Sequence, residues 1–480
     1  MMAYNTESFP RQFAERPQPG NTRMNQPELA TCHCIISHPS KPKFLVIKHS
    51  DRWAPPTVGI RAEGPMSAKA KIITDGVQQK YGLKTRALRH WVSLPRYHCV
   101  ELEMPSGVTT RKLQAVWVGS KEYAEYRSSA PGSFDPFEAW LKQAEAGHPG
   151  PQRPWERAGW FDGAANWMLH ELDRAGVQVT GSVEQFMAFR LASCVLRVRT
   201  AEGDMYLKAG VAQQPLEARL TRAVARRWPD RVPEPLAVDE RQNWMLSRDY
   251  EAAGMQLQFG DYPSIARAVA RLQVESMSEL QNWHGLGCPT VDPGELVTFA
   301  EDPGRLSVIL GKGGENALGE SELDRLLQLA GAWKAAGQAL ADLPLPNALL
   351  HDDLWYPNLY RREGGFWITD WSGAMIGHPF FSVLKLLRFR ALWQGAQAPL
   401  PDGDEACAKL TEAIVSEYLE PFAHFDTAER LCEALALARQ LEGPWRLLKW
   451  TRAIEREEHG GFHYQRIART MRRIARELLE

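Results

Sequence analysis

The 480-residue chain lacks several features that would define its class at once. It has no run of about 18 uncharged apolar residues, the minimum for a membrane-spanning helix. It has no excess of either charge, because 57 basic and 58 acidic residues give a formal net charge of -1, and we therefore expect no nucleic-acid partner. Seven cysteines without a framework spacing favour free thiols in a reducing compartment, so we expect a cytoplasmic protein. Residues 1–25 lack the apolar core of a signal peptide and are predicted to be a disordered tail.

The length is too great for one hydrophobic core and predicts two or three domains. The clearest interruption is AGHPGPQRPWER, where prolines and glycines predict a linker over residues 147–157. We expect a small α/β domain over 26–146, a β-rich part over 158–254 and a largely helical part over 255–480. The predicted fold class is therefore α+β.

Local patterns predict individual elements within this division. A helix in AKAKIITDGVQQKYGL should end near Gly82, and another is expected in WFDGAANWMLHELDRAG. RYHCVELEMPSGVTTRKLQAVWVG predicts two strands around a Pro-Ser-Gly turn, and SCVLRVRTAEGDMYLKAG predicts a hairpin. We interpret the arginines of the final segment, YQRIARTMRRIARELLE, as the solvated face of a docked helix.

The stretch HDDLWYPN, residues 351–358, carries an imidazole, two adjacent carboxylates and a carboxamide. Transfer of a phosphoryl group from ATP needs a carboxylate that accepts the proton of the attacking hydroxyl, and oxygen ligands for magnesium. Asp353 and Asn358 could serve as base and ligand on one loop. The segment NLYRREGGFWITDW then predicts a hairpin that returns Asp370 to the neighbourhood of Asn358 as a second ligand.

The pattern HxDxxxxN, a short hairpin and IxDW resembles the aminoglycoside and choline phosphotransferases, which have a protein-kinase-like fold of two lobes. The resemblance implies that Asp353 is the catalytic base, that Asn358 and Asp370 bind Mg²⁺, and that His351 braces the loop. Further upstream it implies that Lys208 orients the phosphates of ATP and is held by Glu217. Short polar residues also cap turns in ordinary loops, and that interpretation applies to each of these residues taken singly.

Three positions depart from the pattern of that family. RLASCVLRV contains no glycine, so the resemblance implies that Ser193 contacts the phosphates in place of a Gly-rich loop. Asp352 stands where glycine is frequent and adds a negative charge. Ser382 stands where an aspartate would brace the catalytic loop.

The first domain resembles the Nudix fold in its strand, loop and helix, which end in Tyr-Gly-Leu. Nudix hydrolases bind magnesium through several glutamates on that helix, but this chain has Gly76, Gln79 and Lys80 at the corresponding positions. We therefore expect a degenerate Nudix-like domain without hydrolase activity. CysHisCys at residues 32–34 is interpreted as an ordinary strand, because successive side chains of a strand point to opposite faces.

The sequence thus favours an ATP- and Mg²⁺-dependent phosphotransferase that acts on a hydroxyl group of a small molecule. The alternative is a nucleotide-binding pseudokinase or regulator without turnover. The identity of the acceptor and the oligomeric state stay open.

Overall fold

The computed structural model describes most of the chain from residue 29 to residue 479. The described residues are 29–49, 52–61, 66–94, 96–111, 113–126, 135–147, 153–211, 217–250, 256–291, 293–300, 302, 304, 307, 310, 317–343, 345–392, 400–455 and 462–479. The predicted tail over 1–25 and residues 148–152 of the predicted linker lie outside them.

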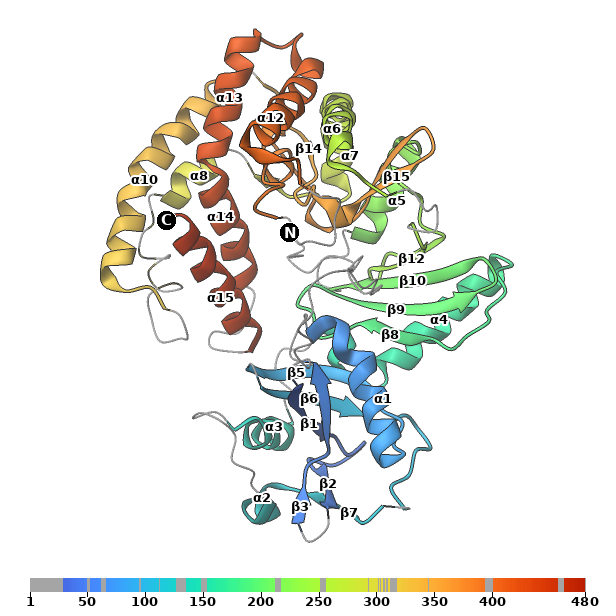
Figure 1. Ribbon diagram of the computed structural model, residues 1–480. Coiled ribbons are helices and arrows are strands. Elements are labelled where there is room, and N and C mark those ends of the chain that lie inside the picture. The colour runs from blue at the N-terminus through green and yellow to red at the C-terminus, as the bar shows by residue number, and fades with distance from the viewer. Residues whose placement is uncertain are drawn as a thin grey trace. The chain divides into compact units, whose positions relative to one another are not determined.

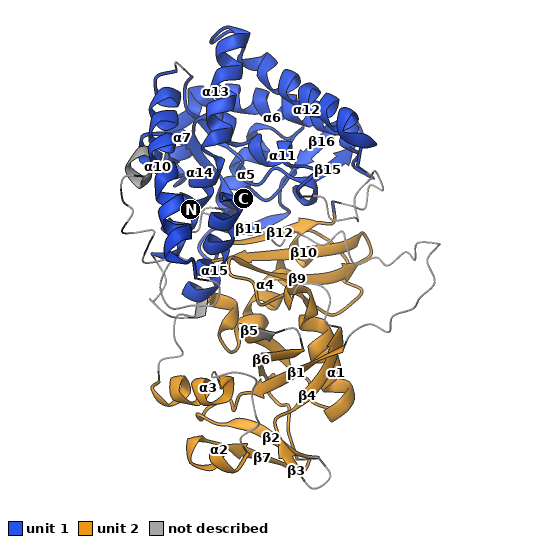
Figure 2. Cartoon of the chain, turned by 60° about the vertical axis from the view of Figure 1, so that its left-hand side comes forward, with its two compact units in different colours: residues 1–15, 214–243, 250–480 blue, residues 16–213, 244–249 orange. Residues whose placement is uncertain are grey.

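The chain divides into two compact units, which Figure 2 shows in different colours. Unit 2 comprises residues 16–213 and 244–249, and unit 1 comprises residues 1–15, 214–243 and 250–480. Unit 2 therefore contains both the segment predicted to be Nudix-like and most of the β-rich segment that follows it. The domain boundaries expected near 147–157 stay predictions.

The first part of unit 2 is built from two small sheets and three helices. One sheet has the order β4-β1-β6-β5, in which β1 runs parallel to β6, and the other has the order β3-β2-β7. The elements are β1 (Leu29–Ile36), β2 (Phe44–His49), β3 (Arg52–Ala54), β4 (Thr57–Arg61), α1 (Ala70–Tyr81), β5 (Arg86–Leu94), β6 (Tyr97–Glu103), β7 (Ala115–Val118), α2 (Ser120–Tyr126) and α3 (Pro136–Glu145).

Aromatic side chains fill the core of this part. Phe44 lies 5.2 Å from Phe137 and 6.0 Å from Trp140 between ring centroids, within a buried cluster that joins β2, α3 and the neighbouring strands. The helix α1 ends where it was predicted to end, because Gly82 adopts a left-handed φ of 70° and donates to the carbonyl oxygen of Gln78.

The second part of unit 2 is an antiparallel sheet preceded by the helix α4 (Trp160–Arg174). Its strands are β8 (Glu184–Met187), β9 (Ser193–Thr200), β10 (Gly203–Gly210) and β12 (Trp244–Arg248), in the order β12-β10-β9-β8. The hairpin of β9 and β10 pairs residue by residue from Gly203 with Thr200 to Gly210 with Ser193. Both the helix and this hairpin were predicted, and both are confirmed.

Unit 1 is mainly helical, and its strands are short (Figure 1). Its helices are α5 (Glu217–Arg227), α6 (Tyr262–Ser276), α7 (Leu280–Gly285), α8 (Pro293–Ala300), α10 (Glu320–Ala341), α11 (Leu384–Leu387), α12 (Gly403–Leu419), α13 (Ala428–Gln440), α14 (Glu442–Ile454) and α15 (Phe462–Glu477). Its strands are β11 (Ala237–Asp239), β13 (Thr290–Val291), β14 (Ala348–Leu350), β15 (Leu359–Arg362), β16 (Gly365–Ile368) and β17 (Met375–Gly377).

The helices of unit 1 pack in pairs around buried apolar faces. α6 packs against α12, α8 against α10, and α14 against the terminal helix α15. The docking of α15 was predicted, and Ile467, Met471 and Ile474 are buried as expected. The prediction of a solvated arginine face was wrong for Arg472, which is buried, whereas Arg469 and Arg473 are exposed. The long aliphatic stem of an arginine can pack against apolar surface, which a pattern of charged residues does not predict.

The mixed composition of helices and sheets confirms the predicted α+β class. The strand β5 was not predicted, because RALRHWVSL has no clean alternation of apolar and polar residues. Within the described ranges, no helix combines the length and apolar character required to cross a membrane.

Candidate active site

The loop HDDLWYPN lies in unit 1 between the buried strand β14 and the hairpin of β15 and β16. Its last three residues form a short 3-10 turn, and the fixed φ of Pro357 is compatible with the first turn of a helix. The turn feeds directly into β15 at Leu359, so Asn358 is held at the junction. Asn358 is completely buried and Asp353 is 7% exposed. Two such polar residues in the interior need partners.

Asn358 and Asp353 bind each other. The side-chain nitrogen of Asn358 donates to the carboxylate oxygen Oδ2 of Asp353 at 2.8 Å and to its backbone oxygen at 2.9 Å. These two bonds fix the orientation of the carboxamide, so its oxygen Oδ1 points elsewhere. That oxygen is buried and meets no hydrogen-bond donor among the described residues. A buried acceptor without a donor is costly, and it is a position where a cation can bind.

The predicted hairpin is confirmed and connects Asp370 with Asn358. β15 and β16 pair from Leu359 with Ile368 to Arg362 with Gly365, and the backbone nitrogen of Thr369 donates to the backbone oxygen of Asn358 at 2.9 Å. The next residue, Asp370, has a left-handed φ of 63°, an uncommon conformation that Asp tolerates better than most residues. Ser372 donates to its Oδ1. The hairpin thus brings the two predicted ligands to adjacent backbone positions.

His351 contacts both the loop and the residue that follows the hairpin, and its bracing role stays a prediction. Its Nδ1 accepts from the backbone nitrogen of Asp353 at 3.2 Å, so the proton of a neutral ring lies on Nε2, which faces the backbone oxygen of Thr369 at 2.9 Å. Burial lowers the pKa of His351, which keeps the ring neutral. The ring also packs edge-on against Trp371 at 4.8 Å between centroids. One side chain therefore ties the loop to the end of the hairpin.

Ser382 keeps the bracing position that an aspartate would fill in the family pattern. Its hydroxyl oxygen accepts from the backbone nitrogen of His351 at 3.1 Å and from the side-chain nitrogen of Gln273 at 3.1 Å. Gln273 belongs to α6, and its side-chain oxygen lies 2.6 Å from the hydroxyl of the buried Tyr418 of α12. The loop is thereby connected to two packed helices without a carboxylate.

Two lysines that the sequence analysis did not single out neutralise the adjacent aspartates. Lys385 of α11 forms an ion pair with Asp353 Oδ1, and Lys449 of α14 forms one with Asp352 Oδ2. The indole nitrogen of Trp445 also donates to Asp352 Oδ1 at 3.2 Å. Burial lowers the pKa of Lys449, and the neighbouring charge of Asp352 opposes that shift. Only the three-dimensional packing reveals these partners, because they lie far along the chain.

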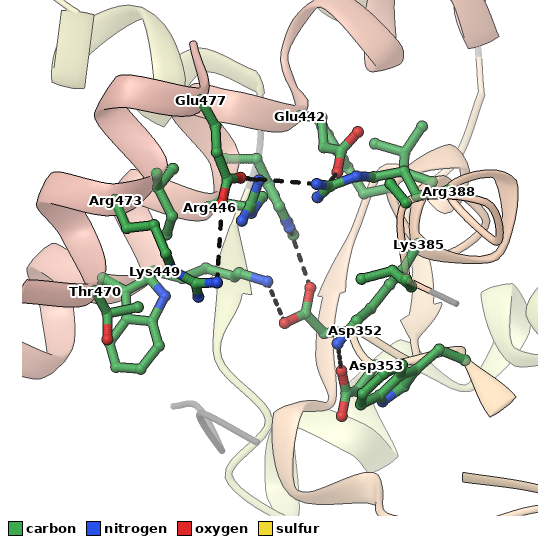
Figure 3. A pocket seen from close by; sticks show the side chains of 18 residues that line it. Asp352, Asp353, Lys385, Arg388, Glu442, Arg446, Lys449, Thr470, Arg473 and Glu477 are labelled. Carbon is green, nitrogen blue, oxygen red and sulfur yellow. Dashed lines mark hydrogen bonds and ion pairs between the residues drawn. The ribbon is translucent and has the colours of Figure 1, made fainter. Parts of the chain in front are cut away.

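Asp353 and Asp352 open into a cavity of about 300 Å³ in unit 1, which Figure 3 shows from close by. Its walls come from the loop, the segment 381–392, α14 and α15. A cavity of this size is at the small end of the range that holds small-molecule ligands. The carboxylate of Asp353 is therefore accessible to a small molecule, whereas its backbone is fixed by His351 and Asn358.

Lys208, Ser193 and Glu217 lie outside this loop. Lys208 is 5% exposed on β10 and Ser193 is buried at the start of β9, both in unit 2. Glu217 begins α5 in unit 1, and Asn243 caps that helix by accepting from the backbone nitrogen of Ala218 at 3.0 Å. α5 packs against the turn Trp371–Gly373 that follows Asp370. The pairing of Lys208 with Glu217 and the phosphate contact of Ser193 stay predictions.

In overall structure the chain is similar to small-molecule phosphotransferases, which are the kinds of protein that the sequence pattern resembles. A macrolide 2'-phosphotransferase from Brachybacterium faecium is 14% identical, with a TM-score of 0.43, and the match covers 64% of this chain and 97% of the other. A choline/ethanolamine kinase family protein from Mesorhizobium loti is 20% identical, with a TM-score of 0.39, and the match covers 67% and 95%.

A spectinomycin phosphotransferase in complex with ADP and spectinomycin is 11% identical, with a TM-score of 0.41, and the match covers 65% of this chain and 94% of the other. No protein-family model and no curated protein matches the sequence. Likenesses this distant say nothing about the chemistry of the site, which depends on the contacts within this chain.

Proposed function

We propose that this protein transfers the terminal phosphoryl group of ATP to a hydroxyl group of a small molecule, with Asp353 as the catalytic base. The observation that carries the proposal is the pairing of Asp353 with Asn358, which leaves the oxygen of the carboxamide buried and without a donor from any residue that the structure describes. An ordinary capping residue would direct that oxygen to a backbone nitrogen. Its availability favours a site that binds a cation.

The residues present fit a magnesium ion. Magnesium prefers oxygen ligands and takes few from the protein when phosphates supply the others. The carboxamide oxygen of Asn358 and the carboxylate of Asp370 would hold it, and when bound it would neutralise charge on the phosphates.

Two contacts orient the carboxylate of Asp353, and this supports the proposed role as a base. Its Oδ1 pairs with Lys385 and its Oδ2 accepts from Asn358, but each carboxylate oxygen has a second lone pair. The acceptor hydroxyl would give its proton to Asp353 while its oxygen bonds to the γ-phosphorus and the bond from that phosphorus to the ADP oxygen breaks. Lys208, held by Glu217, would orient the phosphates.

Three further parts of the proposal come from the sequence. Ser193 would contact the phosphates, and the segment 26–146 would be a degenerate Nudix-like domain without hydrolase activity. All seven cysteines are free thiols, and a cytoplasmic location is part of the proposal.

The test is the magnesium-dependent release of ADP across a panel of hydroxyl compounds, with wild type, Asp353→Asn and Asp342→Asn. Loss of a general base costs about 10²- to 10⁴-fold in rate, so Asp353→Asn should be nearly inactive. Asp342→Asn makes the same change at an exposed helix end and should keep full activity.

A second variant tests the metal. Asn358→Ala should raise the Mg²⁺ concentration required for half-maximal ADP release. Turnover that survives in Asp353→Asn would refute the role of the base. Nucleotide binding without turnover on any acceptor would favour the regulatory alternative instead.

A further inference from the structure

The charges that line the cavity beside Asp353 are arranged in two groups (Figure 3). One group surrounds the two aspartates of the loop, and the other is an arginine cluster formed by Arg388, Arg446 and Arg473 with their acidic partners. Together they give five basic and four acidic side chains: Lys385, Arg388, Arg446, Lys449 and Arg473, with Asp352, Asp353, Glu442 and Glu477.

The carboxylates of the loop are already neutralised. Asp352 pairs with Lys449, and Asp353 pairs with Lys385, one lysine to each carboxylate. The side chain of Lys385 also lies over the ring of Trp355, 4.6 Å from its centroid. An amine or a polyamine that enters the cavity would be repelled by these lysines. It would find each carboxylate of the loop already paired with a lysine.

Among the described residues that line the cavity, the arginine cluster has one more positive than negative charge. Glu442 binds Arg388 at 2.9 Å, and Glu477 binds Arg446 at 2.9 Å. The third guanidinium, of Arg473, comes no closer to Glu477 than 3.9 Å, which is beyond hydrogen-bond length. Its side chain is 59% exposed, so it can turn to meet a ligand. Three arginines thus share two glutamates.

Aromatic and aliphatic side chains also line the cavity. Phe381 stacks on Trp445 with ring centroids 4.0 Å apart and an interplanar angle of 5°. Trp450, Leu384 and Ile474 complete the apolar lining. A ligand in the cavity can therefore contact both apolar surface and the positive charge of the arginine cluster.

We propose that the acceptor of this enzyme is a hydroxylated small molecule that carries one acidic group on an apolar or aromatic body. Its hydroxyl would face Asp353, and its carboxylate or phosphate would bind the arginine cluster through Arg473, because a guanidinium pairs with either anion in two parallel hydrogen bonds. This inference rests on the proposed function and excludes polyamines and quaternary ammonium alcohols as acceptors.

Three matched probes test the charge of the acceptor. Phenyllactate, 3-phenylpropane-1,2-diol and phenylalaninol share an aromatic ring and a hydroxyl on a three-carbon chain, but they are anionic, neutral and cationic in turn. Isothermal titration of each into the full-length protein should give binding about tenfold tighter for phenyllactate than for the diol, with phenylalaninol the weakest. Added salt should weaken only the binding of phenyllactate.

Two variants locate the anion site. Arg473→Gln should weaken the binding of phenyllactate about fivefold to tenfold, because a charged hydrogen bond is lost. The binding of the diol should stay unchanged. Arg469→Gln removes another arginine of the same helix, which is exposed and does not line the cavity. This control should change the affinity for neither compound. Circular dichroism of both variants confirms that the fold is retained.

Each result decides one proposal. The proposed acceptor class would be overturned if phenylalaninol or kanamycin bound as tightly as phenyllactate. It would also be overturned if phenyllactate binding could not be detected at millimolar concentration, or if Arg473→Gln did not change it. These are binding measurements without nucleotide, so they stand apart from ADP release. Failure of ADP release alone would overturn the proposed function and leave the anion site intact.

Discussion

Asp352 and Lys449 form a buried ion pair, and the two single substitutions that break it should cost very different amounts of stability. The side chains are 12% and 11% exposed, so both charges lie largely out of water. Lys449→Met keeps most of the side-chain volume, but of the two donors found for this carboxylate in the described ranges it leaves the indole nitrogen of Trp445. Removal of one partner of a buried pair costs about 3–5 kcal/mol, and we expect α14 to lose that much stability against local opening.

The converse change should be milder. In Asp352→Asn the remaining charge belongs to Lys449, whose pKa burial already lowers, so the ammonium can lose its proton instead of staying charged in the interior. We expect a loss of about 1–3 kcal/mol. The double variant Asp352→Asn with Lys449→Met removes both charges and should recover most of the loss seen in Lys449→Met.

Hydrogen exchange measured by mass spectrometry reports the local free energy of opening in each unit separately. Peptides that cover α14 carry the signal, and peptides from β9 and β10 in unit 2 are the internal control. A cost below about 1 kcal/mol for Lys449→Met would refute the reasoning, because so small a value is typical of an exposed pair. A double variant no more stable than Lys449→Met would show that the two charges are not coupled.

The same lysine predicts a pH dependence with a definite sign. The folded-state pKa of Lys449 is lower than its ordinary value of 10.5, so the unfolded chain binds more protons in the window below that value. The contribution of Lys449 to the free energy of unfolding therefore rises as the pH increases toward 10.5. Urea unfolding at several alkaline pH values should show a shallower rise in Lys449→Met than in wild type.

Two smaller changes and one control substitution test how the loop and the strand β17 are supported. Ser382→Ala removes the acceptor of the buried backbone nitrogen of His351 and should cost about 1–3 kcal/mol in the same exchange measurement; protection of the loop equal to wild type would show that the hydroxyl is not its brace. Gly377→Ala would place a Cβ 2.5 Å from the backbone oxygen of Val291, so it should separate β13 from β17 at a cost of about 1–3 kcal/mol. Gly365→Ala meets no atom within 4 Å and should change stability by less than about 0.5 kcal/mol, as measured by urea unfolding.

The features that the sequence predicts best are those governed by local chemistry. The turn of Glu363 and Gly364 between two apolar runs predicted the hairpin, and the hairpin in turn joined Asp370 to Asn358. The end of α1 at Gly82 is predictable for the same reason, since glycine adopts the left-handed conformation with no steric cost.

The partners of the loop could not be predicted in this way. Lys385 is 32 residues from Asp353 and Lys449 is 97 residues from Asp352, and lysines are common enough that none of them is singled out by its type. Ser382 departs from the family pattern, which left the rigidity of the loop in question. Its hydroxyl accepts the same kind of bond that a carboxylate would accept, and a sequence pattern that compares residue types misses that equivalence.

The two adjacent aspartates differ in a way that only their surroundings explain. Both line the cavity and both are neutralised by a lysine, so neither exposure nor charge separates them. Asp352 takes its second bond from Trp445 in α14, which fixes it to the wall. Asp353 takes its second bond from Asn358, whose side-chain oxygen has no donor in the part of the chain that the structure describes. A base must lie beside the metal that neutralises the transferred group, so we propose Asp353, and not Asp352, as the base.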